Sequence, residues 1–88
     1  MAKLYKTNGT IENIEPANGK DFSLEELQEI VGGYIQVVPV FGNKCIVVDE
    51  EGRMKDYKHN ETASQLVFGQ VIGDIVGDML LCNQTEIK

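Results

Sequence analysis

Tryptophan is absent from this 88-residue sequence, which also has only one histidine, two prolines and two cysteines. Two cysteines and one histidine cannot by themselves complete a usual tetrahedral zinc site, so we expect no metal site. Cys45 and Cys82 form no C-x-x-C pair and lie in apolar runs. Such runs are typical of buried, reduced thiols, with a single Cys45–Cys82 disulfide as the alternative.

Long apolar runs are also missing. No stretch approaches the roughly 20 residues of a membrane helix, and the first residues lack the apolar run of about 7–15 residues of a signal peptide. We therefore expect a cytoplasmic protein that does not bind membranes. The net charge of −6 argues against nucleic-acid binding, which needs a basic face, and favours a partner that carries a basic patch.

The chain consists of apolar segments separated by turn residues, which predicts one α+β domain over residues 1–88, ordered from about 3 to 83. A β-hairpin is expected over residues 3–15 around Asn8-Gly9, because both positions of this dipeptide tolerate positive φ. Two further strands are expected at 34–41, buried on both faces or nearly so, and at 44–49. Pro39 indicates an edge, an end or a bulge.

The best-supported helix covers residues 23–31, where Ser23 and Glu26 have the spacing of a capping box. Leu24, Leu27 and Val31 share its apolar face. Asn60 predicts the cap of a short helix over 61–67. A short strand at 54–57 is optional, and a final strand is expected at 75–82, where Gly77 indicates a bulge or a close backbone approach. Together the strands predict a mostly antiparallel sheet of four to six strands, followed by a frayed tail.

No catalytic residue can be named from the sequence. The carboxylates fall into three groups that have simpler explanations as a helix face, a hairpin turn and loop positions: Glu25, Glu26 and Glu29; Asp49, Glu50 and Glu51; and Asp74 and Asp78. No phosphate-binding loop is present, and the protein is expected not to be an enzyme. The one local concentration of positive charge is the candidate binding surface: Arg53, Lys55, Tyr57, Lys58 and His59.

Ordered short motifs over most of residues 8–82 resemble a known family. They are Asn18-Gly19-Lys20 with Phe22 to Gln28, Val31 to Ile35, Val47 to Gly52, Asn60-Glu61 with Ala63, and Ile75 to Asp78. The family is domain of unknown function three-eight-four-six, which occurs in gut-type bacteria, their phages and mobile elements. The resemblance implies a stand-alone domain without an activity to carry over.

Three classes of function follow as hypotheses. The first is a non-enzymatic module that binds a host or phage protein and modulates a host system. The second is a small-ligand or nucleotide binder that uses the residues from Arg53 to His59, with Tyr34 or Tyr57 as a stacking face. An enzyme that uses the scattered carboxylates is the least supported of the three. The sequence leaves the oligomeric state open, because an exposed strand edge could also pair two chains.

Overall fold

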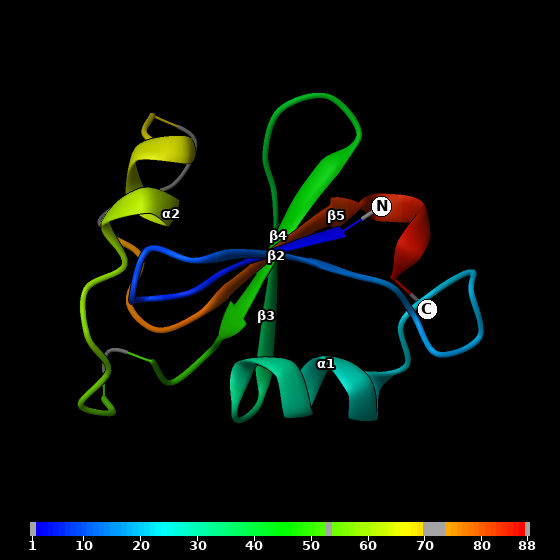
Figure 1. Ribbon diagram of the computed structural model, residues 1–88, viewed down its shortest axis with the longest axis horizontal. Helices are drawn as coiled ribbons and strands as arrows, with labels where there is room; N and C mark the ends of the chain where they lie inside the picture. Colours follow the sequence, from blue (N-terminus) through cyan, green and yellow to red (C-terminus); the bar gives the residue numbers. More distant parts are fainter. Residues whose placement is uncertain (1, 53, 70–73, 88) are drawn as a thin grey trace.

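The computed structural model describes residues 2–52, 54–69 and 74–87 as a five-stranded antiparallel sheet with two α-helices, which confirms the α+β prediction (Figure 1). The strand order in the sheet is β2-β1-β5-β4-β3. In chain order the elements are β1 (Ala2–Tyr5), β2 (Ile11–Ile14), α1 (Leu24–Val31), β3 (Ile35–Pro39), β4 (Lys44–Asp49), α2 (Glu61–Leu66), β5 (Met79–Asn83) and a short 3-10 helix, η1 (Gln84–Glu86). None of the described helices is long and apolar enough to cross a membrane.

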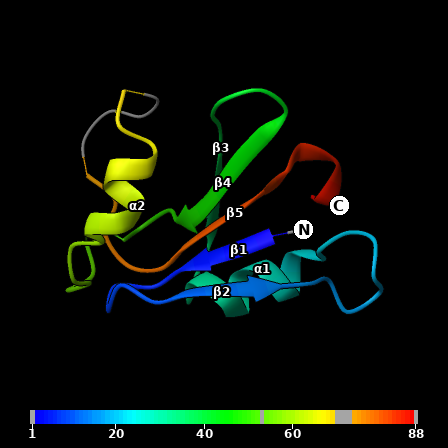
Figure 2. The same cartoon turned by 45° about the horizontal axis from the view of Figure 1, so that its top comes forward.

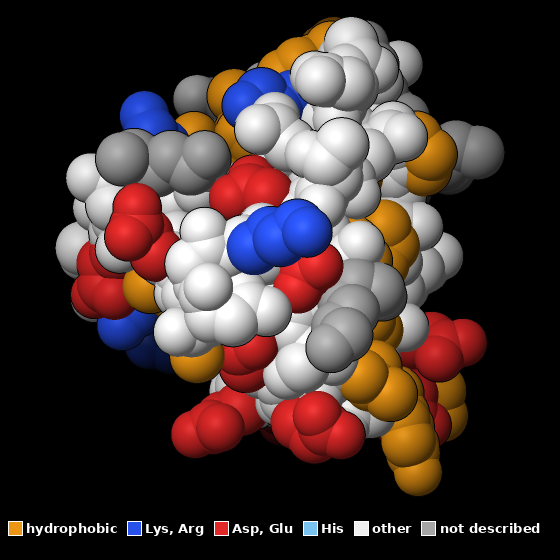
Figure 3. Space-filling model, turned by 90° about the vertical axis from the view of Figure 1, so that its right-hand side faces the viewer, with side chains coloured by type: hydrophobic (Ala, Val, Ile, Leu, Met, Phe, Trp, Pro, Cys, Tyr) orange, Lys and Arg blue, Asp and Glu red, His pale blue; other side chains and the backbone are white. Residues whose placement is uncertain are grey.

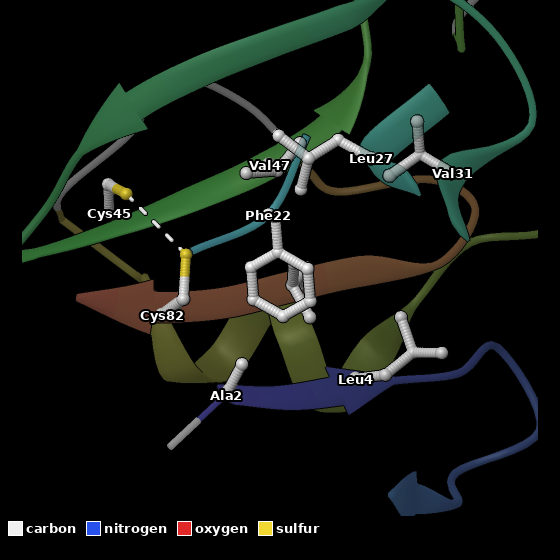
Figure 4. Close-up of a cluster of buried hydrophobic side chains, with 9 residues drawn as sticks. Ala2, Leu4, Phe22, Leu27, Val31, Cys45, Val47 and Cys82 are labelled. Atoms are coloured by element: carbon white, nitrogen blue, oxygen red, sulfur yellow. Dashed lines mark hydrogen bonds between the residues drawn. The ribbon is translucent and has the colours of Figure 1, made fainter. Parts of the chain in front are cut away.

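The two helices pack against opposite faces of the sheet. Successive residues of a strand point to opposite faces, so each helix covers a different set of alternate side chains. Figures 1 and 2 show α1 and α2 well apart, with the strands between them. On the α1 side, Phe22 and Leu27 pack against alternate residues of the central strands (Figure 4). On the α2 side, Ala63 and Val67 pack against Ile46 and the other set of alternate residues.

The first hairpin is confirmed, but its turn is longer than predicted. Lys6 N–H donates to Thr10 O over 2.9 Å, and Gly9 N–H donates to Lys6 O over 3.0 Å. This is a three-residue loop in which only Gly9 has positive φ, at 88°. Asn8 instead accepts a hydrogen bond from the Thr10 backbone with its side-chain oxygen.

The predicted burial of the strand around residues 35–39 on both faces is wrong, because β3 lies at the edge of the sheet. Val37 is 41% exposed and Gln36 and Pro39 are exposed as well. Continuous β-branched residues therefore indicated a strand but not a central one. The hairpin of β3 with β4 is confirmed, with Val37 opposite Val47 and Pro39 opposite Cys45.

The capping box of α1 is confirmed by two reciprocal hydrogen bonds. Ser23 Oγ accepts from Glu26 N–H at 3.2 Å, and a Glu26 carboxylate oxygen accepts from Ser23 N–H at 2.9 Å. Leu27 and Val31 are buried as predicted, but Leu24 is 54% exposed. The side chain of Leu24 therefore lies outside the buried face that Leu27 and Val31 share.

Three predictions for the chain after β4 are wrong. Residues 54–57 contain a turn at 54–56 and form no strand. β5 begins at Met79 and not at residue 75, because Gly77 turns the chain with φ 75°. The tail is not frayed up to residue 87, since Phe22 N–H donates to Glu86 O over 2.7 Å and Ile87 packs against the core on the α1 side.

Asn60 is a fully buried polar residue that joins three segments. Its side-chain oxygen accepts from Ala63 N–H at 3.1 Å, which confirms the cap of α2. Its amide group donates to Tyr5 O and to Gly77 O, each at 2.8 Å. One side chain thus fixes α2 to β1 and to the turn before β5.

Replacing Asn60 tests this joint. Asn60→Ala removes the cap acceptor and the donor to the buried Tyr5 and Gly77 carbonyls, so we expect a loss of about 3 kcal/mol in the free energy of unfolding. Urea denaturation measures it, and Asn13→Ala on the exposed side of β2 is the matched control, expected within about 0.5 kcal/mol of the wild type. Equal effects of the two substitutions would contradict the assignment.

Candidate functional site

The buried carboxylate of Asp49 forms the most elaborate polar cluster among the described residues. Asp49 is the last residue of β4 and is 6% exposed. One carboxylate oxygen accepts from Lys55 Nζ at 2.7 Å and from the Tyr57 hydroxyl at 2.8 Å. The other oxygen accepts from Glu51 N–H at 2.8 Å. A buried carboxylate needs such partners, because its desolvation is otherwise strongly unfavourable.

A turn after β4 brings these partners back to Asp49. Gly52 N–H donates to Asp49 O at 3.0 Å, and Lys55 N–H donates to Glu51 O at 3.2 Å. The chain therefore folds over the strand end, and Lys55 also reaches Gly32 O at the end of α1, at 3.3 Å. The cluster links β4, the segment of residues 50–58 and the C-terminus of α1.

Glycines make this close packing sterically possible. A Cβ atom on Gly33 would lie 2.5 Å from Lys55 Nζ and 2.8 Å from Asp49 Oδ2. A Cβ atom on Gly77 would lie 2.8 Å from the Tyr57 ring. All three distances are too short for a real Cβ atom, so the backbone approaches the cluster directly at these two glycines.

The electrostatics of the cluster hold Asp49 ionised. Burial by itself raises the pKa of Asp49, but hydrogen bonds from Lys55, from the Glu51 backbone and from Tyr57 outweigh it, so the pKa lies below its ordinary value. The hydrogen bond to Asp49 raises the pKa of Lys55 and also that of Tyr57. At neutral pH the positive charge of Lys55 is therefore largely compensated by Asp49.

Four of the five predicted binding residues lie among the described residues, and Arg53 lies outside them. Lys55 and Tyr57 are directed at Asp49, whereas Lys58 is exposed. His59 lies beside α2, with its Nε2 3.5 Å from Asp74 Oδ2. The prediction that these residues bind a partner stays a prediction, and Lys55, Tyr57 and His59 each contact another side chain of the domain.

His59, Ser64 and Asp74 lie together at an open hollow of about 460 Å³ that Phe68 also lines. Their geometry differs from a Ser-His-Asp triad, in which the hydroxyl and the carboxylate contact different ring nitrogens. Here both lie at His59 Nε2, with Ser64 Oγ at 3.4 Å. Ser64 Oγ is also bonded to the backbone of Ile75, accepting from its N–H at 2.8 Å and donating to its carbonyl at 3.3 Å. The hydroxyl therefore serves to position the chain before β5.

The other carboxylates of the three groups are dispersed. Glu26 belongs to the capping box and also accepts from Ala17 N–H at 2.9 Å. Asp78 accepts from Thr7 N–H at 3.2 Å. Within the part of the chain that the structure describes, no group of three or more potential metal ligands is close enough to hold an ion.

Sequence reasoning missed the role of Asp49, which it assigned to a polar turn. The available signal was its position directly after Cys45 to Val48, in the alternating register that places Cys45 and Val47 in the core. A charged residue in that register must be buried unless the strand ends first.

One comparison with known proteins gave a match. A family model described as Domain of unknown function (DUF3846) matches residues 6–87. No curated protein and no solved structure matches the chain significantly.

Asp49→Asn tests the cluster. The amide retains the shape of the side chain but places an NH₂ group against one of three donors and removes the charge, so we expect a loss of about 2 kcal/mol in the free energy of unfolding. Urea denaturation with Glu50→Gln as control measures it, because Glu50 is the exposed neighbour. An unchanged midpoint for Asp49→Asn would show that the cluster does not stabilise the fold.

Proposed function

The chain belongs to the family Domain of unknown function (DUF3846), and we propose that it is a non-enzymatic module that binds an extended segment of a partner protein along the free edge of β3. The observation that carries this proposal is the outer edge of β3, which pairs with no other strand of the described residues and has exposed Val37 in its middle. Adding a strand to an exposed sheet edge is a recurring mode of peptide recognition.

The hydrogen-bonding pattern identifies the free groups of this edge. Glu50 N–H donates to Tyr34 O at 2.8 Å, and Val40 N–H donates to Lys44 O at 3.1 Å. In an antiparallel pair such bonds recur at every second residue, so Tyr34, Gln36, Val38 and Val40 face β4. Ile35 and Val37 then direct their N–H and C=O groups outward. Pro39, which has no N–H, also faces outward, so the ladder with β4 loses no hydrogen bond at this position.

Apolar side chains beside this edge add a surface for the partner. Tyr34 is 65% exposed, and Phe41, just beyond β3, is 40% exposed. Figure 3 shows, on one face of the molecule, a broken column of hydrophobic side chains with acidic side chains gathered at the level of α1.

Charge indicates the kind of partner. The segment from Tyr34 to Phe41 carries no charge, whereas exposed Glu50 lies next to Tyr34, exposed Glu25 and Glu29 lie on α1, and the chain has a net charge of −6. A second copy would bring the same negative charge to the same edge. A strand flanked by Lys or Arg is therefore the favoured occupant. In the phage or mobile-element setting that the family resemblance implies, that strand belongs to a host protein.

The alternative of a small ligand is less well supported. The hollow beside Tyr34 and Lys55 is about 230 Å³, below the range of about 300–1,000 Å³ that is usual for ligand sites. The hydroxyl of Tyr57 is bonded to Asp49, and its ring packs against Gly77. Among the described residues, the hollow at Tyr34 is therefore smaller than a usual ligand site, and the ring of Tyr57 packs within the domain.

Proline substitutions at the two edges of the sheet test the proposal. Val37→Pro removes one outward N–H of β3, and Asn13→Pro is the same change on β2, where the pairing of Lys6 with Thr10 places Asn13 outward. The probe is a short capped peptide of alternating Val and Lys, with a Val–Glu peptide as its charge control. We expect the Val–Lys peptide to slow hydrogen exchange at the Ile35 and Val37 amides, and Val37→Pro to weaken its binding about tenfold.

The matched variant and the charge control decide between the outcomes. Both prolines leave every charge in place, so electrostatic attraction alone predicts equal binding by the wild type and both variants. Wild-type affinity for Val37→Pro would contradict the proposal. An equal loss for Asn13→Pro, or self-association through β3 in sedimentation, would also overturn it.

A further inference from the structure

Cys45 and Cys82 lie directly opposite each other on the two central strands, β4 and β5. Their sulfur atoms are 3.8 Å apart, and both thiols are free in the structure (Figure 4). Cys45 is 1% exposed and Cys82 is 0% exposed, in the core on the α1 side beside Phe22 and Val47. Packing as two apolar residues accounts for their burial but not for their pairing.

The backbone already has a geometry that a disulfide accepts. Gln84 N–H donates to Asn43 O at 2.8 Å, two residues along each strand from the cysteines, so Cys45 and Cys82 form a hydrogen-bonded pair. Cα atoms in such pairs are about 5.5 Å apart, within the range of about 4.4–6.8 Å for disulfides. Closing the gap to the roughly 2 Å of an S–S bond requires side-chain rotation together with an approach of the two Cβ atoms, which are about 4.5–5.5 Å apart in opposite strand residues and about 3.5–4.5 Å apart in disulfides.

We propose that Cys45 and Cys82 form a reversible dithiol–disulfide pair, oxidised by small-molecule disulfides, that locks β4 to β5. The two residues are 37 positions apart. The bond would close a loop that contains Asp49, Asn60 and α2. Oxidation would thus restrict the unfolded chain across both buried polar joints of the domain.

The chemistry is two successive exchange steps with glutathione disulfide as the oxidant. The thiolate of one cysteine attacks the disulfide, which forms a mixed disulfide and releases one glutathione thiolate. The second cysteine attacks the mixed disulfide, which forms the Cys45–Cys82 bond and releases the second glutathione. The two cysteine protons pass to the two released thiolates, so the cysteines lose two electrons and glutathione disulfide gains them.

Burial makes this exchange slow in the native state. Desolvation raises the pKa of Cys45, and desolvation together with Cys45 raises that of Cys82 to about 12. The reactive thiolates are therefore rare until the end of the β4–β5 pair opens. The rate of oxidation would then follow the local opening of these two strands.

The test is incubation of the reduced wild-type chain with glutathione disulfide, in native buffer and in urea below the unfolding midpoint. We expect an intact mass lower by two hydrogen atoms without a glutathione adduct, faster formation in urea, and a Tm raised by about 5 °C or more that dithiothreitol reverses. Cys82→Ala is the control, which can form only a glutathione adduct at Cys45.

Three results would overturn the proposal. A stable glutathione adduct on the wild type would show that the second sulfur cannot reach the first. An unchanged mass in urea would show that the pair is inaccessible even when the strands open. Disulfide formation with a lowered Tm would show that the bond strains the sheet and does not lock it.

Discussion

A carboxylate almost completely removed from water needs donors within hydrogen-bond distance, and one end of this domain is arranged around that need. Asp49 obtains its donors from Glu51, Lys55 and Tyr57, in a segment without regular secondary structure. These hydrogen bonds to Asp49 therefore hold Glu51, Lys55 and Tyr57 in place, where no helix or strand does. Removing one partner would leave a buried charge uncompensated, so the cluster stabilises the fold only as a unit.

Asp49 and Asn60, the two buried polar residues in the part of the chain that the structure describes, are connected through the turn before β5. Tyr57 donates to Asp49 with its hydroxyl and packs its ring against Gly77, and Gly77 O accepts from the Asn60 amide. The connection before α2 and the turn before β5 are thus linked by these contacts to the packing on both faces of the sheet. The outer edge of β3 has no such cover among the described residues, and this contrast distinguishes the proposed binding edge from the structural joints.

Local signals predicted the elements well, because they act through the backbone nearby. Ser23 with Glu26 and the cap residue Asn60 each specify a helix start irrespective of the rest of the fold. Strand order is not a local property. The β-branched run around Val37 therefore predicted a strand correctly but predicted its burial wrongly. The site was missed for the same reason. Tyr57 reaches Asp49 across eight positions, and Gly33 approaches from the connection between α1 and β3. The resemblance anticipated the family but carried no activity, so the function rests on the geometry of the edge.

Asp49 is buried and yet ionised, and an NMR titration of its side-chain carboxyl carbon tests this directly. We predict a midpoint below the ordinary value of about 3.9, and a higher midpoint in Lys55→Met. Since the folded pKa is the lower one, this carboxyl stabilises the fold above the unfolded pKa, and that stability is lost as the pH falls through the folded pKa. A midpoint at or above the ordinary value, unchanged in Lys55→Met, would contradict the account.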